Sequence, residues 1–83
     1  MHVIAVHAIS QPDSFFAAAQ PTPIPEGMSL WSVIPSSDHS RCVCIWEADS
    51  QQAVADLVER TVDEYSANEY FEVDSAMAQG LPA

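Results

Sequence analysis

The chain has 83 residues, which is enough for a single domain over residues 1–83, and 48% of them are hydrophobic. Its formal net charge is −10, with two arginines and no lysine. This charge excludes nucleic acids and anionic membrane surfaces as partners, because both are bound largely through basic side chains. The acidity either serves solubility or reflects a saline cytoplasm.

The sequence also predicts a cytoplasmic location. Its first residues lack the basic segment of a secretion signal, and no apolar run approaches the roughly 20 residues that span a bilayer. Cys42 and Cys44 are two positions apart, and on a strand they point the same way, which is a poor geometry for a bond between them. We therefore expect no disulfide framework.

The first half of the chain predicts a strand and a short helix. Residues 3–9 are nearly all apolar, which indicates a buried strand. Ser10 is expected to cap a helix that has Pro12 in its first turn, and Pro21 ends this helix and opens a stiff proline-rich connector. The buried stripe of the helix is expected to be Phe15, Phe16 and Ala19.

A hairpin and a second helix follow. Residues 28–34 and 41–48 predict two strands joined by a polar turn. Apolar residues then recur at helical spacing over residues 54–65, about four turns. Asp49 and Ser50 compete for the N-cap position of this helix, and the residue three places after Asp49 is the glutamine of a capping box.

Residues 68–74 alternate and predict a last strand, so the order of elements is β-α-β-β-α-β. With right-handed crossovers this order predicts an α+β, ferredoxin-like fold with an antiparallel sheet in the order 4-1-3-2 and both helices on one face. The central strands, residues 3–9 and 41–48, are apolar at odd and even positions, although two helices cover only one face. We therefore expect a homodimer through the open sheet face; the alternative is a monomer whose C-terminal tail folds over that face.

Three segments carry a family resemblance: the first strand up to His7, residues 43–54, and residues 68–73. They resemble a family of small bacterial ferredoxin-like proteins that form dimeric α/β barrels, some of which bind nickel. The family pattern has a histidine that closes the first strand and a cysteine in the third, which His7 and Cys44 match. A looser similarity is to cofactor-free antibiotic-biosynthesis-type monooxygenases of the same barrel superfamily.

The resemblance also bears on cofactors. Metal-binding members of the family carry further histidines in or after the second helix, whereas here no histidine follows His39. We therefore expect no resident cofactor and at most weak nickel binding, for which His7 would be the ligand.

The candidate ligand-binding residues are His7, Trp31, Cys44 and Trp46, and no residue is assigned a catalytic role. His7 is either a hydrogen-bonded core histidine or an acid–base group in a pocket, since histidine titrates near neutral pH. The simplest hairpin register places Trp31 opposite Cys44 and on the same face as Trp46, which would form an aromatic wall for a planar apolar ligand. We also expect His7 and Cys44 to share a face.

Three functions remain open. The first is a small-molecule-binding homodimer, metal-assisted or not, without strong catalysis. The second is a cofactor-independent monooxygenase or isomerase that acts on a planar apolar substrate. The third is a stress or interaction protein whose surface is its function.

Overall fold

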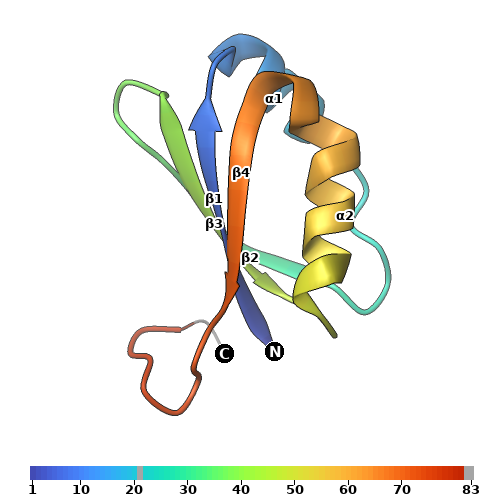
Figure 1. The fold of residues 1–83 in the computed structure, drawn as a ribbon, viewed down its shortest axis with the longest axis vertical. Helices are drawn as coiled ribbons and strands as arrows, with labels where there is room; N and C mark the ends of the chain where they lie inside the picture. Colours follow the sequence, from blue (N-terminus) through green and yellow to red (C-terminus); the bar gives the residue numbers. More distant parts are fainter. Residues whose placement is uncertain (21, 82–83) are drawn as a thin grey trace.

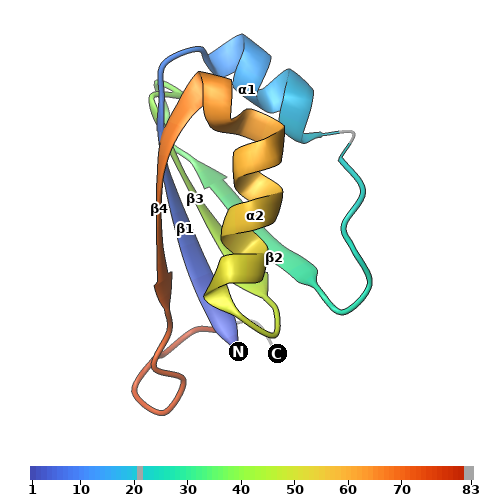
Figure 2. The ribbon, with the colours of Figure 1, turned by 45° about the vertical axis from the view of Figure 1, so that its right-hand side comes forward.

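The computed structural model describes residues 1–20 and 22–81 and has an α+β fold with one four-stranded antiparallel sheet. The strand order is β2-β3-β1-β4, which is the predicted order 4-1-3-2 read from the other edge. The strands are β1 (His2–Ile9), β2 (Ser29–Pro35), β3 (Arg41–Glu47) and β4 (Ser66–Glu72). Figures 1 and 2 show that helices α1 (Pro12–Ala19) and α2 (Gln51–Val62) both cover the same face of this sheet.

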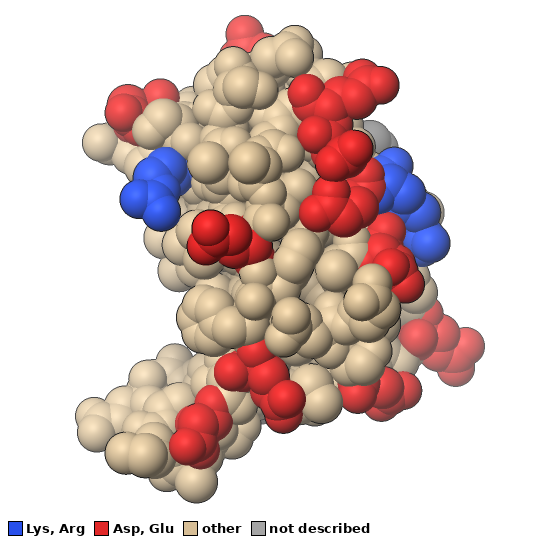
Figure 3. Space-filling view, in the orientation of Figure 1, with Lys and Arg blue, Asp and Glu red and all other residues tan. Residues whose placement is uncertain are grey.

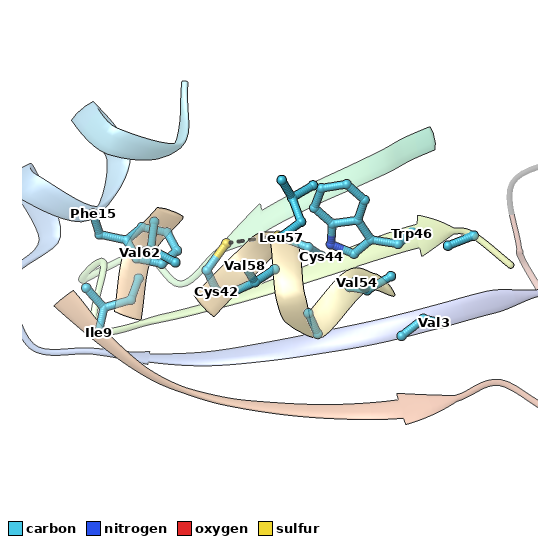
Figure 4. Close-up of a cluster of buried hydrophobic side chains, with 12 residues drawn as sticks. Val3, Ile9, Phe15, Cys42, Cys44, Trp46, Val54, Leu57, Val58 and Val62 are labelled. Carbon is cyan, nitrogen blue, oxygen red and sulfur yellow. Dashed lines mark hydrogen bonds between the residues drawn. The ribbon is translucent and has the colours of Figure 1, made fainter. Parts of the chain in front are cut away.

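The central strands decide which side chains the helices bury. Ala5 of β1 lies opposite Cys44 of β3 and also opposite Tyr70 of β4. Side chains at opposed positions point to the same face, and alternate positions point to opposite faces. The odd-numbered residues of β1 and the even-numbered residues of β3 therefore face the helices and are buried. Figure 4 shows the β3 side chains pointing toward Leu57 and Val58 of α2.

The start of α1 differs from the prediction. Gln11, not Ser10, occupies the N-cap position, and no side chain among the described residues caps this helix. The Ser10 hydroxyl instead donates a hydrogen bond to the carbonyl of Tyr65, 3.1 Å away, and the Ser10 amide donates to the same oxygen. Ser10 thus joins the end of β1 to the start of β4, a tertiary role that competes with capping. The predicted end at Pro21 lies outside the described residues.

Ser50, and not Asp49, occupies the N-cap position of α2. Ser50 has an extended backbone, and its hydroxyl accepts a hydrogen bond of 3.1 Å from the amide of Ala53. The capping box built on Asp49 is wrong, because the Gln52 amide donates to Asp56 within the helix. Ser50 therefore satisfies one of the amides that the first turn leaves without a helical partner.

Helix α2 ends earlier than the periodicity predicts. The α-helix stops at Val62, and residues Asp63–Tyr65 form a 3-10 turn, η1. A 3-10 turn is tighter than an α-helical turn, so the chain reverses sooner and β4 begins at Ser66 instead of residue 68.

The sheet face away from the helices remains open and apolar. Ile4 lies opposite both Ile45 and Phe71, and none of these three side chains faces the helices. Phe71 is 52% exposed and Ile34 of β2, on the same face, is 56% exposed. In Figures 1 and 2 the part of the C-terminal tail that the structure describes, residues 73–81, runs beyond the ends of the strands and does not cover this face.

The cap of α2 gives a direct test of the helix assignment. Replacing Ser50 by alanine removes an acceptor from the first turn, so we expect the free energy of unfolding to fall by about 1 kcal/mol. Chemical denaturation measures this change. The matched control is Asp49→Ala, which removes no hydrogen bond to α2 and should cost less than half as much. An equal loss for both variants would contradict the assignment of Ser50 as the cap.

Candidate functional site

A cavity of about 90 Å³ lies between the helix layer and the sheet, and its walls are almost entirely apolar. His7, Cys44 and Trp46 lie deep in its lining and are buried. Its rim is formed by exposed side chains, Ile24 of the α1–β2 connector and Val33 of β2. The cavity is therefore closed by the sheet at its base and open to solvent beside the edge strand.

Three of the four predicted site residues meet at this cavity. The register pairs His7 with Cys42 and Ala5 with Cys44, so both cysteines share a face with His7, as expected. Trp46 lies further along the same face of β3. The register therefore brings the expected histidine, thiol and indole to one surface.

The predicted position of Trp31, opposite Cys44, is wrong. The pairing of β2 with β3 shifts between Leu30 and Ser32, which is a β-bulge, and Trp31 occupies the extra position. Its side chain is 44% exposed, and its Nε1 donates a hydrogen bond of 3.1 Å to the Glu47 carboxylate. Leu30 and Val33 line the cavity instead, with Val33 opposite Cys44. The aromatic wall thus consists of Trp46 together with phenylalanines of α1.

His7 is held by a hydrogen bond to β4. It is 2% exposed, and its Nδ1 lies 2.7 Å from Oδ1 of Asn68, the residue directly opposite on β4. The amide group of Asn68 is oriented by Ser66, because its Nδ2 donates to the Ser66 carbonyl and its Oδ1 accepts from the Ser66 hydroxyl. An amide oxygen only accepts hydrogen bonds, so Nδ1 of His7 carries the proton. Nε2 is then unprotonated, and it has no hydrogen-bond partner among the described residues.

Burial keeps this imidazole neutral. Loss of water around the ring lowers the pKa of His7, and this effect exceeds the opposing effects of Asn68 and of the negative charge of Glu59. A neutral imidazole with Nδ1–H committed to Asn68 presents Nε2 as an acceptor or a base. No pattern in the sequence pointed to Asn68, although its place opposite His7 follows once the register is known.

Glu59 of α2 interacts with both His7 and Asn68. The Tyr70 hydroxyl donates to the Glu59 carboxylate over 2.7 Å, and this hydrogen bond lowers the pKa of Glu59. Burial raises the pKa of Tyr70, and the hydrogen bond to Glu59 raises it further. Asp63 lies beside Glu59, and the interaction of the two carboxyl groups raises the pKa of Asp63. The acidic last turn of α2 therefore has a structural role, because the Glu59 carboxylate accepts a hydrogen bond from Tyr70 of β4.

The two thiols are not arranged as nucleophiles. Their Sγ atoms are 4.0 Å apart, without a bond between them, and both side chains are buried (Figure 4). Burial raises the pKa of Cys42 and of Cys44, so both remain protonated near neutral pH. Cys44 therefore contributes to the cavity as a small apolar wall residue.

Trp46 carries a fully enclosed side-chain nitrogen, Nε1, that has no hydrogen-bond partner among the described residues. Buried indole N–H groups usually find an acceptor, so this donor stands out in an otherwise apolar lining. Within residues 1–20 and 22–81, no group of three or more His, Cys, Asp or Glu side chains is placed to hold a metal ion.

Comparisons with protein-family models, curated proteins and solved structures found no match to this chain. The family resemblance of the sequence therefore stays a prediction. Among the described residues, no helix is both long enough and apolar enough to cross a membrane.

The buried imidazole should make stability depend on pH. Because burial lowers the pKa of His7 in the folded state, the unfolded chain takes up this proton first as the pH falls below 6.5. The contribution of His7 to the free energy of unfolding is therefore fully present above pH 6.5. It is lost as the pH falls toward the lower folded-state pKa, by at most about 1.4 kcal/mol per pH unit. Chemical denaturation between pH 7.5 and 5.5 measures this slope.

We expect His7→Phe to remove this contribution to the slope. His39, at the exposed tip of the hairpin, provides the control: His39→Gln should keep the slope of the wild-type protein. An unchanged slope in His7→Phe would show that His7 is protonated as readily in the folded chain as in the unfolded one.

Proposed function

We propose that this protein is a homodimeric binding domain for a small, neutral, apolar molecule that occupies the cavity beside His7. One observation carries the proposal: an apolar cavity that opens to solvent ends on a neutral, oriented imidazole. Ligand sites are typically concave, mostly apolar and supplied with few polar groups that fix orientation. A core histidine that served only packing would not require an accessible cavity beside it.

The size of the cavity limits the ligand. Pockets for drug-sized molecules have volumes of roughly 300–1,000 Å³. An engineered apolar cavity of about 150 Å³ binds benzene. At about 90 Å³ this cavity suits one small ring or a short chain, part of which would extend toward the rim.

Charge limits the ligand further. No cationic side chain is among the described residues that line the cavity, and the chain carries a net charge of −10. Figure 3 shows acidic side chains gathered along α2 and the two arginines far apart. An anion would lose its hydration without gaining a cationic partner, so a neutral molecule is favoured.

An enzyme is the second candidate, and the orientation of His7 favours it. A general base needs its proton-accepting atom free and its other ring nitrogen held, which is the state that Asn68 imposes. Such an enzyme would take a proton from a small aromatic substrate, without a cofactor, as an isomerase or a monooxygenase. Oxygen uptake or solvent deuterium exchange with small aromatic substrates, lost in His7→Phe, would favour this function over binding alone.

The open sheet face supports the dimer. Its exposed apolar side chains form the kind of contiguous patch that monomeric soluble proteins rarely leave uncovered. A standard interface covers roughly 800 Å² per partner, which is about 15% of the 5174 Å² accessible surface of the chain. One face of a small sheet can supply that area.

The charges at the ends of β3 fit a twofold arrangement. Arg41 begins this strand and Glu47 ends it, and both occupy positions on the open face. A twofold axis through the middle of β3 runs the two copies of the strand in opposite directions and brings Arg41 of each copy toward Glu47 of the other. The apolar positions between them, Val43 and Ile45, then form the centre of the interface.

Filling the cavity should abolish ligand binding. Toluene is a suitable probe, and fluorescence of Trp46 in a Trp31→Phe background reports its binding. Ala19 of α1 lines the cavity, so the larger side chain of Ala19→Leu should occupy the space and remove the response. Ala17→Leu, on the exposed side of the same helix, should retain it. No response to toluene in the background variant would contradict the proposed cavity.

Charge on the open face should separate the dimer. We expect light scattering at micromolar concentration to give a mass of about 18 kDa, twice the 9.0 kDa of the chain. Ile45→Asp places a carboxylate in the proposed interface and should reduce the mass to that of one chain, because burying an unpaired charge is unfavourable. Ala17→Asp, on the exposed side of α1, should leave the dimer intact. A wild-type mass of 9.0 kDa would end this part of the proposal.

A further inference from the structure

We infer that the ligand is a hydroxyl compound of the small phenol or alcohol class, whose O–H donates a hydrogen bond to Nε2 of His7. This inference rests on the proposed binding function and names the chemistry of the molecule that the cavity selects. The hydrogen bonds of the polar side chains that line the cavity carry it.

Three of the five polar side chains in the lining, those of His7, Thr22 and Thr61, present only acceptors to a ligand. The hydroxyl of Thr61 donates to the Leu57 carbonyl at 2.6 Å, and the hydroxyl of Thr22 donates to the Ala18 carbonyl at 2.9 Å. Each threonine has thereby used its only proton and keeps only acceptor lone pairs. His7 has likewise committed Nδ1–H to Asn68 and keeps Nε2 as an acceptor.

His7 is the acceptor that best fits a ligand. Imidazole Nε2 is unshared among the described residues, whereas both threonine oxygens already take part in helix-type hydrogen bonds. Nδ1 is turned to β4, and Nε2 lies at the end of the ring away from the β1 backbone. Without a donor, a ligand beside His7 would leave this nitrogen desolvated and unpaired, which is unfavourable in an apolar site.

Two donors in the lining are less suited to a ligand. The Cys44 thiol is a weak donor that lies 4.0 Å from the sulfur of Cys42. Nε1 of Trp46 is fully enclosed, and Trp46 lies four positions along β3 from Cys42, the residue opposite His7. The competing hypothesis is that Nε1 of Trp46 donates to the ligand, which would then be a hydrogen-bond acceptor such as a nitrile.

Three probes of similar size separate these readings. Phenol supplies a donor, fluorobenzene has nearly the same shape without one, and benzonitrile supplies only an acceptor. Calorimetric titration of the full chain measures the affinity for each. We expect phenol to bind roughly fivefold to tenfold more tightly than fluorobenzene, the effect of one hydrogen bond in a buried site.

The outcomes distinguish the inference from the proposed function. Equal affinity for phenol and fluorobenzene would overturn the hydroxyl class and leave the binding function standing. Tightest binding of benzonitrile would overturn it in favour of Trp46. Failure of all three probes to bind would overturn the function and the inference together.

Two variants identify which side chain accepts the hydrogen bond from phenol. His7→Phe should reduce the preference for phenol over fluorobenzene to less than twofold. Thr61→Val, which keeps the shape of the threonine and removes its oxygen, should leave the preference unchanged. Loss of the preference in Thr61→Val with retention in His7→Phe would overturn the role of His7.

A measurement on the wild-type protein keeps the test available if His7→Phe does not fold. In protein labelled with ¹⁵N-histidine, the Nε2 resonance of His7 should move on addition of phenol and stay in place with fluorobenzene. The Nδ1 resonance, held by Asn68, should change little. Equal movement of Nε2 with both probes would show that it senses occupancy of the cavity and accepts no hydrogen bond.

Discussion

The pairing of β1 with β3 is the constraint on which the rest of the structure depends. It sets Ala5 opposite Cys44 and His7 opposite Cys42, and it thereby decides which side of each strand the helices cover. A slip of one residue would turn His7 to the open face and place its apolar neighbour Val6 beneath the helices. The cavity, the oriented imidazole and the uncovered apolar surface are all consequences of this one register.

The sequence predicted the architecture where a signal was periodic or continuous. The apolar central strands and the helical spacing beginning at Val54 identified the order of elements, and that order with right-handed crossovers led to the strand arrangement. The errors fall where tertiary contacts decide. Ser10 has the chemistry of a helix cap, but its hydroxyl donates instead to the carbonyl of Tyr65, 55 positions later in the chain. Spacing along the sequence carries no trace of such a contact.

The candidate site was predictable to a similar extent. Parity along β1 separated His7 from His2, and the register brought Cys44 and Trp46 to the same face. The prediction for Trp31 failed for two reasons. The hairpin pairs Pro35 with Cys42, two residues away from the simplest register, and a bulge between Leu30 and Ser32 leaves Trp31 without an opposite residue on β3. Asn68 was missed because an asparagine in a strand becomes informative only when its opposite residue is known.

The hydrogen bond between His7 and Asn68 spans 61 positions of the chain, which gives it a meaning during synthesis. At elongation rates of roughly 5–20 residues per second, Asn68 is joined about 3–12 seconds after His7. During that interval the imidazole lacks the partner that fixes its proton. β4, which follows β1 and β3 in the chain, thus gives the buried imidazole its defined protonation state.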